Sequence, residues 1–126
     1  MVMHLVKLCV GISSVEELEA SMARTAASRR AAGEPPVSIH VTRMTPARRD
    51  AVENGGSLYW VIAGAIQCRS EIISLETIDG EDGIRRCGIV MSTEVIRTAR
   101  APRRPFQGWR YLKPEDAPQD LLEAGS

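Results

Sequence analysis

Apolar residues recur along the chain with two different periods, and these periods predict its first elements. Residues 2–10 are almost wholly apolar and are followed by Gly11, which is typical of a short strand covered on both faces. Ser14 then forms a capping box with Glu17 ahead of apolar positions at helical spacing, and Gly33 ends the pattern. The helical face consists of Val15, Leu18, Met22 and Ala26. The chain is therefore predicted to begin with a strand and a long helix.

The next segment predicts a half-buried strand and a short helix. Apolar and polar residues alternate over residues 37–43, so the apolar side chains should face the core and His40 should face away from it. The inward-facing members would be Val37, Ile39 and Val41. A Thr-Pro pair at 45–46 begins a helix of about two turns, and an Asn-Gly-Gly run at 54–56 ends it.

Residues 57–78 form the longest strand-like region. They are dense in β-branched and aromatic residues, and Gly64 is suited to a bend or a bulge, so we expect more than one straight strand. Two Asp-Gly turn signals at 79–83 and the alternation over 84–91 then predict a hairpin. Together these elements predict an α+β domain with a mostly antiparallel, strongly bent sheet and one long and one short helix. A small barrel is one way to close such a sheet.

Length and composition indicate one globular domain over residues 1–126. A chain of this length can bury roughly two-thirds of its unfolded surface. Apolar residues make up 44% and charged residues 25%, which argues against disorder and against a disulfide scaffold. The Pro-rich stretch at 102–105 should be extended and irregular, and residues 117–126 are expected to form a frayed tail.

Opposite charges balance over the whole chain but are separated along it. Sixteen Lys and Arg against 16 Asp and Glu give zero formal net charge, so no global field would attract a polyanion. Residues 71–82 carry acids and no base, whereas residues 97–113 carry bases and no acid. Binding of a polyanion would therefore have to be local to residues 97–113.

The three cysteines, Cys9, Cys68 and Cys87, lie far apart and show neither the close pairs of a zinc site nor a disulfide framework. We expect reduced core thiols. His4 and Lys7 interrupt the apolar start of the chain, which argues against a signal peptide, and no apolar run approaches membrane-spanning length. The sequence thus predicts a cytoplasmic protein that makes no contact with a membrane and has no metal site and no cofactor.

The last third of the chain gathers aromatic and basic residues. If residues 107–113 are extended, Trp109 and Tyr111 project from one face and Arg110 from the other. Rings flanked by arginines can stack bases, at about 1 to 3 kcal/mol per base, while guanidinium groups contact phosphates. The predicted nucleic-acid-binding residues are Trp60, Arg103, Arg104, Trp109, Arg110 and Tyr111.

A structural explanation competes with this one. Trp109 and Tyr111 could instead pack on Trp60 and close the sheet. Arg103 and Arg104 could pair with the acids of residues 71–82, which would only hold the terminal segment against the fold.

Catalytic motifs are absent from the sequence. Neither Lys7 nor Lys113 follows a Gly-rich loop, and no GxGxxG run occurs. A small-molecule enzyme with an unrecognised pocket would have His40, Arg43 and Cys68 as its candidate residues. The sequence therefore favours a binding module over an enzyme.

Four strings, HVTRM, GGSLYWVIAGAIQCR, DGIRRC and RRPFQGWRYLKPEDAP, resemble those of a bacterial conserved family, the domain of unknown function 1489. The resemblance covers nearly the whole chain, and it implies no assigned activity, substrate, cofactor or catalytic residue. Residues 55–78 are also similar, more loosely, to the small barrels of the PUA-like superfamily, many of which bind RNA or modified bases.

Two classes of function follow from these observations. The first is a non-catalytic binding module for RNA or another anionic ligand, based on the arginine and aromatic cluster. The second is a protein-interaction or homodimerisation module that uses the same Trp, Tyr and Arg side chains as anchors, since these residue types are enriched at binding hot spots.

Overall fold

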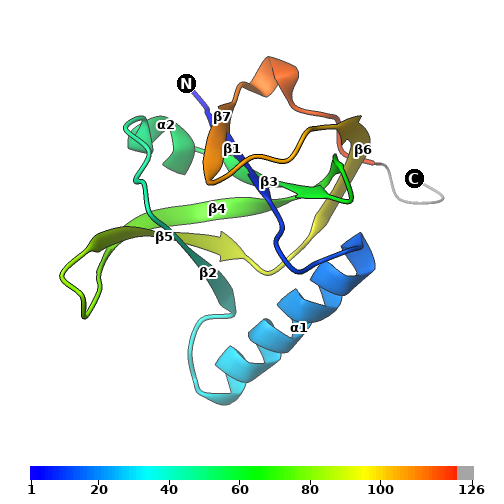
Figure 1. Cartoon of the computed structure of the whole chain (residues 1–126). Helices are drawn as coiled ribbons and strands as arrows, with labels where there is room; N and C mark the ends of the chain where they lie inside the picture. Colours follow the sequence, from blue (N-terminus) through cyan, green and yellow to red (C-terminus); the bar gives the residue numbers. More distant parts are fainter. Residues whose placement is uncertain (122–126) are drawn as a thin grey trace.

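The computed structural model describes residues 1–121 and contains seven strands, two α-helices and one 3₁₀-helix in that part of the chain (Figure 1). In chain order these elements are β1 (His4–Leu8), α1 (Val15–Ala31), β2 (Val37–Thr42), α2 (Arg49–Glu53), β3 (Ser57–Ile62), β4 (Ala65–Asp79), β5 (Arg85–Ser92), β6 (Ile96–Pro102), β7 (Trp109–Leu112) and η1 (Pro114–Asp116).

The strands form one mixed sheet in the order β2-β5-β4-β3-β1-β7, and β6 pairs with β4 outside this path. The β1–β3 pair is parallel, and the other pairings are antiparallel. The prediction of an α+β fold with a mostly antiparallel sheet, one long helix and one short helix is therefore confirmed.

The predicted strong bending and barrel closure are wrong. Within residues 1–121 the end strands β2 and β7 do not pair with each other, so the sheet stays open, and it is not strongly curled. Gly64 was expected to bend or bulge the chain within residues 57–78. Gly64 and Ala63 both adopt positive φ angles, 81° and 51°, and form the tight turn between β3 and β4. The chain therefore reverses at this turn, and β3 and β4 pair as neighbours; the sheet stays open, instead of closing into a PUA-like barrel, because the strand order leaves β2 and β7 at opposite ends.

Helix α1 begins and ends as the sequence predicts. The Ser14 side chain accepts a hydrogen bond from the Glu17 backbone N–H at 3.2 Å, and Gly33, with φ 74°, follows the last turn. All four predicted apolar positions are buried. Figure 1 shows α1 at the opposite side of the molecule from β7 and α2.

The alternation in β2 was read correctly, but its direction was wrong. Ile39 and Val41 are 42% and 47% exposed, whereas the His40 ring meets the buried Trp60 edge-on at 5.5 Å. Ile39 has space on this outer face because Gly88, a nearby residue of the adjacent strand β5, has no side chain. A Cβ atom at Gly88 would lie 3.3 Å from the Ile39 Cγ2 atom. An alternating pattern does not reveal which face of an edge strand meets the core.

The C-terminal segment lies along β6 as far as the structure describes it. The Ala99 N–H donates to the Gln119 carbonyl at 2.7 Å, and the Leu121 N–H donates to the Arg97 carbonyl at 2.8 Å. Residues 119 and 121 of the predicted frayed tail thus have backbone partners on β6, and residues 122–126 of that tail lie outside the described residues. None of the described helices is long and apolar enough to cross a membrane.

Candidate nucleic-acid interface

Trp60 lies in the core and offers no open ring to a base. It is 4% exposed in the middle of β3, and its indole Nε1–H donates to the Ser70 hydroxyl at 3.1 Å. His40 covers its edge. Trp60 therefore belongs to the core cluster against which Trp109 and Tyr111 pack, and its burial removes it from the predicted binding surface.

Trp109 and Tyr111 are half-buried and fasten β7 to the segment between β2 and α2. Their rings meet edge-on at 4.9 Å and pack against the main core. The Trp109 Nε1–H donates to the Met44 carbonyl at 2.8 Å, and the Tyr111 hydroxyl accepts from the Arg48 N–H at 2.9 Å. Both rings thus have a structural role, and the polar atoms of both are engaged within the chain.

Arg110 lies between its two ring-bearing neighbours on β7 and stacks on a different ring. Its guanidinium carbon is 5.1 Å from the centre of the Phe106 ring, and that of Arg103 is 5.8 Å from the same ring. The Arg103 backbone N–H donates to the Gly64 carbonyl at 2.9 Å, which holds the segment after β6 against the β3–β4 turn. Two guanidinium groups therefore gather around Phe106.

These arginines keep their charge available. Arg103, Arg104 and Arg110 have no carboxylate within 4.0 Å in the described part of the chain. A cation–π contact orients a guanidinium group without neutralising it. The structure thus brings Arg103 and Arg110 together with Phe106, and Arg104 adjoins them in sequence as an exposed residue.

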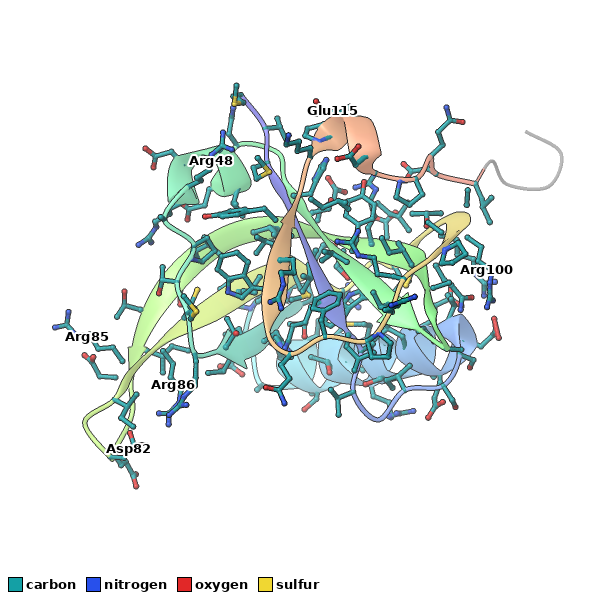
Figure 2. The ribbon with its side chains drawn as sticks, turned by 45° about the horizontal axis from the view of Figure 1, so that its top comes forward. Arg48, Asp82, Arg85, Arg86, Arg100 and Glu115 are labelled. Atoms are coloured by element: carbon teal, nitrogen blue, oxygen red, sulfur yellow. The ribbon has the colours of Figure 1, made fainter. Side chains whose placement is uncertain are left out.

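The acidic segment pairs with arginines of its own hairpin. Arg85 contacts Asp79 at 3.3 Å, and Arg86 contacts Asp82 at 2.8 Å. Hydrogen bonds from the Arg86 side chain and from the Ile84 backbone lower the pKa of Asp82 to about 2. Figure 2 shows this hairpin at one end of the molecule and Arg100 of β6 at the other. The proposed pairing of residues 71–82 with Arg103 and Arg104 does not occur.

A pocket of about 390 Å³ opens beside Trp109. It lies between β7 and the segment that follows β2, and Arg43 and Arg110 contribute to its walls. Met44, which is 69% exposed, adds an apolar side chain. The lining residues are Thr42, Arg43, Met44, Gly108, Trp109 and Arg110. The lining is mainly apolar, and the Arg110 guanidinium itself stacks on Phe106, which packs against a different core cluster from Trp109.

Sequence reasoning missed the contribution of Arg43 and Met44 to this pocket. They lie about 65 positions before Trp109, and spacing alone cannot bring them together. The one sequence signal is that both belong to the string HVTRM, residues 40–44, which is among those shared with the family.

Another pocket, of about 400 Å³ and with a mainly polar lining, lies near the C-terminal segment. His4 Nδ1 accepts from the Ser57 N–H at 2.9 Å, so the ring proton is on Nε2. Burial, with the nearby Arg69 guanidinium, lowers the pKa of His4. Arg69 donates to both carboxylate oxygens of Asp120, at 2.9 and 2.8 Å, and to the Ser57 hydroxyl at 2.8 Å. These three hydrogen bonds hold the C-terminal segment in place.

The cysteines are unsuited to nucleophilic roles at neutral pH. All three are free and buried. Burial raises the pKa of Cys9 to about 11 and that of Cys68 to about 12, so both thiols stay protonated. His40, another candidate for an enzyme site, has its Nε2 atom buried without a hydrogen-bond partner among residues 1–121. Nor do those residues hold a group of three or more His, Cys, Asp or Glu side chains that could bind a metal ion.

The chain belongs to the family of proteins of unknown function DUF1489, whose model matches residues 5–126. The family resemblance drawn from the sequence is confirmed. Neither a curated protein nor a solved structure matches the chain.

Proposed function

We propose that this protein is a binding module for RNA, with a base held in the Trp109 pocket and phosphates contacted by Arg103, Arg104 and Arg110. The observation that carries the proposal is the pocket beside Trp109, which Arg43 also lines, close in sequence to the two guanidinium groups that gather around Phe106. Another anionic ligand with a flat ring would use the same groups.

The ring geometry supports base stacking. The hydrogen bond from Trp109 to the Met44 carbonyl holds the indole in one orientation, and Tyr111 supports it edge-on. An indole that is already ordered loses little conformational entropy when a base stacks on it. Stacking of one base on such a ring contributes about 1 to 3 kcal/mol.

The charge distribution supports contact with phosphates. The chain is neutral overall, so affinity must come from the local group of arginines rather than from a long-range field. Phe106 orders Arg103 and Arg110 without cancelling their charge. Binding of this kind weakens as salt concentration rises. In this proposal the protein acts in the cytoplasm, where its buried thiols remain reduced.

The same side chains could anchor a homodimer, which is the second candidate function. Two observations make it weaker than the first. Trp109 and Tyr111 are half-buried, and the polar atoms of both side chains are hydrogen-bonded to backbone groups of the same chain. Less of each ring is therefore available to fill a pocket on another protein.

The test is fluorescence anisotropy with short single-stranded RNA across a salt series. The Arg103→Ala/Arg104→Ala variant should bind more weakly. Each lost phosphate contact should reduce the slope of log K against log salt by about 0.7, so two contacts reduce it by about 1.4. The control is Arg24→Ala/Arg30→Ala, which removes two exposed arginines from α1, on the far side of the molecule (Figure 1).

Intrinsic fluorescence gives a second measurement, because the chain has two tryptophans and one of them is buried. RNA should quench Trp109, and Trp109→Phe should abolish that quenching and leave the signal of Trp60. Equal affinity of the wild type and of the Arg103→Ala/Arg104→Ala variant would overturn the proposal, as would an equal loss in the α1 control.

A further inference from the structure

The outer face of the β2–β5–β4 part of the sheet carries an apolar patch. Ile39 is paired with Val90, and Val41 is paired with Gly88 across β2 and β5. Residues two apart along a strand share a face, so Ile78 of β4 also belongs to this face. We call these residues the outer patch: Ile39, Val41, Ile78, Val90 and Gly88.

At the centre of the outer patch, Gly88 contributes no side chain. A Cβ atom there would lie 2.6 Å from the Ile78 Cδ1 atom and 3.3 Å from the Ile39 Cγ2 atom, so the two isoleucines close over the glycine. Ile39 and Val41 nevertheless stay 42% and 47% exposed. Val90 is only 7% exposed, and Glu76, which is paired with Gly88, is an exposed acid on the same face. The open apolar surface of the patch is therefore that of Ile39 and Val41, with Ile78 beside them, and such a surface suits packing against another sheet.

The outer patch differs from scattered exposed apolar residues, which are common on protein surfaces. Its members are neighbours on three adjacent strands. It includes β2, an end strand with no charged residue and no proline between Val37 and Thr42. The chain also directs polar residues of β2, such as His40, toward the core and keeps the aliphatic ones outside.

We infer that the outer patch is the interface for a second copy of this chain. A two-fold axis parallel to β5 lays β4 of one copy over β2 of the other. Glu76, which is paired with Gly88, would then face Val41 of the second copy, and Arg43 follows one residue after the end of β2. Both Glu76 and Arg43 are exposed and make no ion pair within residues 1–121. The two-fold axis would form this complementary pair twice.

The size of the outer patch sets the expected strength. It comprises five residues, fewer than the 20 to 30 residues per partner that stable interfaces usually contain. We therefore expect a reversible dimer with a Kd on the order of micromolar or weaker.

Sedimentation from low micromolar to millimolar protein tests the inference. The wild type should shift from monomer to dimer. Ile39→Lys should weaken dimerisation by about tenfold or more, because it places a charge in the apolar contact. Ile84→Lys is the matched control, since Ile84 is 41% exposed, against 42% for Ile39, and lies on the β4–β5 turn outside the patch. Circular dichroism verifies that both variants fold.

A charge exchange tests the orientation of the two copies. Glu76→Arg should weaken the dimer, and Glu76→Arg combined with Arg43→Glu should restore it. A monomer at all concentrations would overturn the inference, and so would equal dimerisation of Ile39→Lys and Ile84→Lys. Arg43 also lines the Trp109 pocket, so RNA binding is measured separately. Ile39→Lys should leave RNA binding unchanged, which makes failure of the dimer distinguishable from failure of the RNA proposal.

Discussion

The two end strands of the sheet use their side chains in opposite ways. β7 (Trp109–Leu112) holds two aromatic residues and an arginine in four positions, and its rings donate to or accept from the backbone of the segment before α2. β2 (Val37–Thr42) holds no charged residue, turns His40 toward the core and leaves Ile39 and Val41 exposed. One end presents charge, and the other presents apolar surface.

This difference shows that the residue types of a strand and the orientation of its side chains together determine which kind of partner it can bind. At β7 the polar atoms of the two rings fix the strand, so the pocket beside Trp109 and the guanidinium groups around Phe106 remain available to a ligand. At β2 the polar residues face the core, so the exposed side chains are the aliphatic ones. The β7 end is therefore suited to an anion and the β2 end to another apolar face. The following predictions test whether the two ends differ as much in stability as they do in chemistry.

The largest expected contrast is between Leu112 of β7 and Ile39 of β2. Leu112 is 3% exposed and packs in the smaller core cluster. Leu112→Ala should lower the free energy of unfolding by about 2 to 5 kcal/mol, because it leaves a cavity. Ile39→Ala removes the same number of carbon atoms from a 42% exposed side chain and should cost about 1 kcal/mol. Urea unfolding measures both values.

These unfolding measurements belong at dilute protein concentration, where a dimer through Ile39 would not contribute. Equal losses for the two variants would mean that β2 is as firmly anchored as β7, and the comparison between the two ends would fail.

A smaller effect is expected from the hydroxyl of Tyr111, which accepts the Arg48 N–H at the start of α2. Tyr111→Phe should lower the free energy of unfolding by about 1 kcal/mol, the usual net value of one hydrogen bond. Tyr59→Phe is the control, because the Tyr59 hydroxyl makes no hydrogen bond to the described residues and its loss should change stability less. If the two variants are equally stable, the Tyr111 hydrogen bond does not fasten β7.

Local patterns were sufficient to predict much of the fold. The Ser14 cap, the apolar face of α1 and the Asp-Gly signals of the β4–β5 hairpin depend on residues close in sequence, and the structure has these elements. Gly64 was located as an irregular point, but a positive φ angle serves a turn as well as a bend. Closure of the sheet depends on which strands become neighbours, and local patterns carry no information about that.

The candidate site was less predictable than the fold. Because side chains alternate along a strand, the sequence was sufficient to predict that Arg110 lies on the opposite face of β7 from Trp109 and Tyr111. The ring between the guanidinium groups, however, is Phe106, and the bond from Trp109 to Met44 spans 65 positions. Such contacts follow from sheet order. The prediction that Trp60 belongs to the site was wrong for the same reason: its burial depends on which strands surround β3, and the sequence alone does not show that order.

The smallest effect concerns a histidine near each end strand. His4 of β1 is paired with Leu112 of β7, and His40 lies in β2. Burial, with the nearby Arg69, lowers the pKa of His4, and burial, with the nearby Lys7, lowers the pKa of His40. As pH falls below the unfolded value of about 6.5, the unfolded chain binds protons that the folded protein does not bind. Stability should therefore decrease as pH falls from 6.5 toward the folded pKa values.

The loss should be less than about 1 kcal/mol for each histidine, because both rings are partly exposed and solvent screens them. Carboxylates such as Asp82 and Asp120, whose pKa values are also lowered, lose their contribution at more acidic pH, below about 4. Urea unfolding between pH 7 and 5 thus isolates the histidines, and His40→Gln should flatten part of the slope. An NMR titration that gives either histidine a pKa at or above 6.5 would contradict this prediction. For His40 it would mean that burial at the β2 end does not disfavour the charged ring.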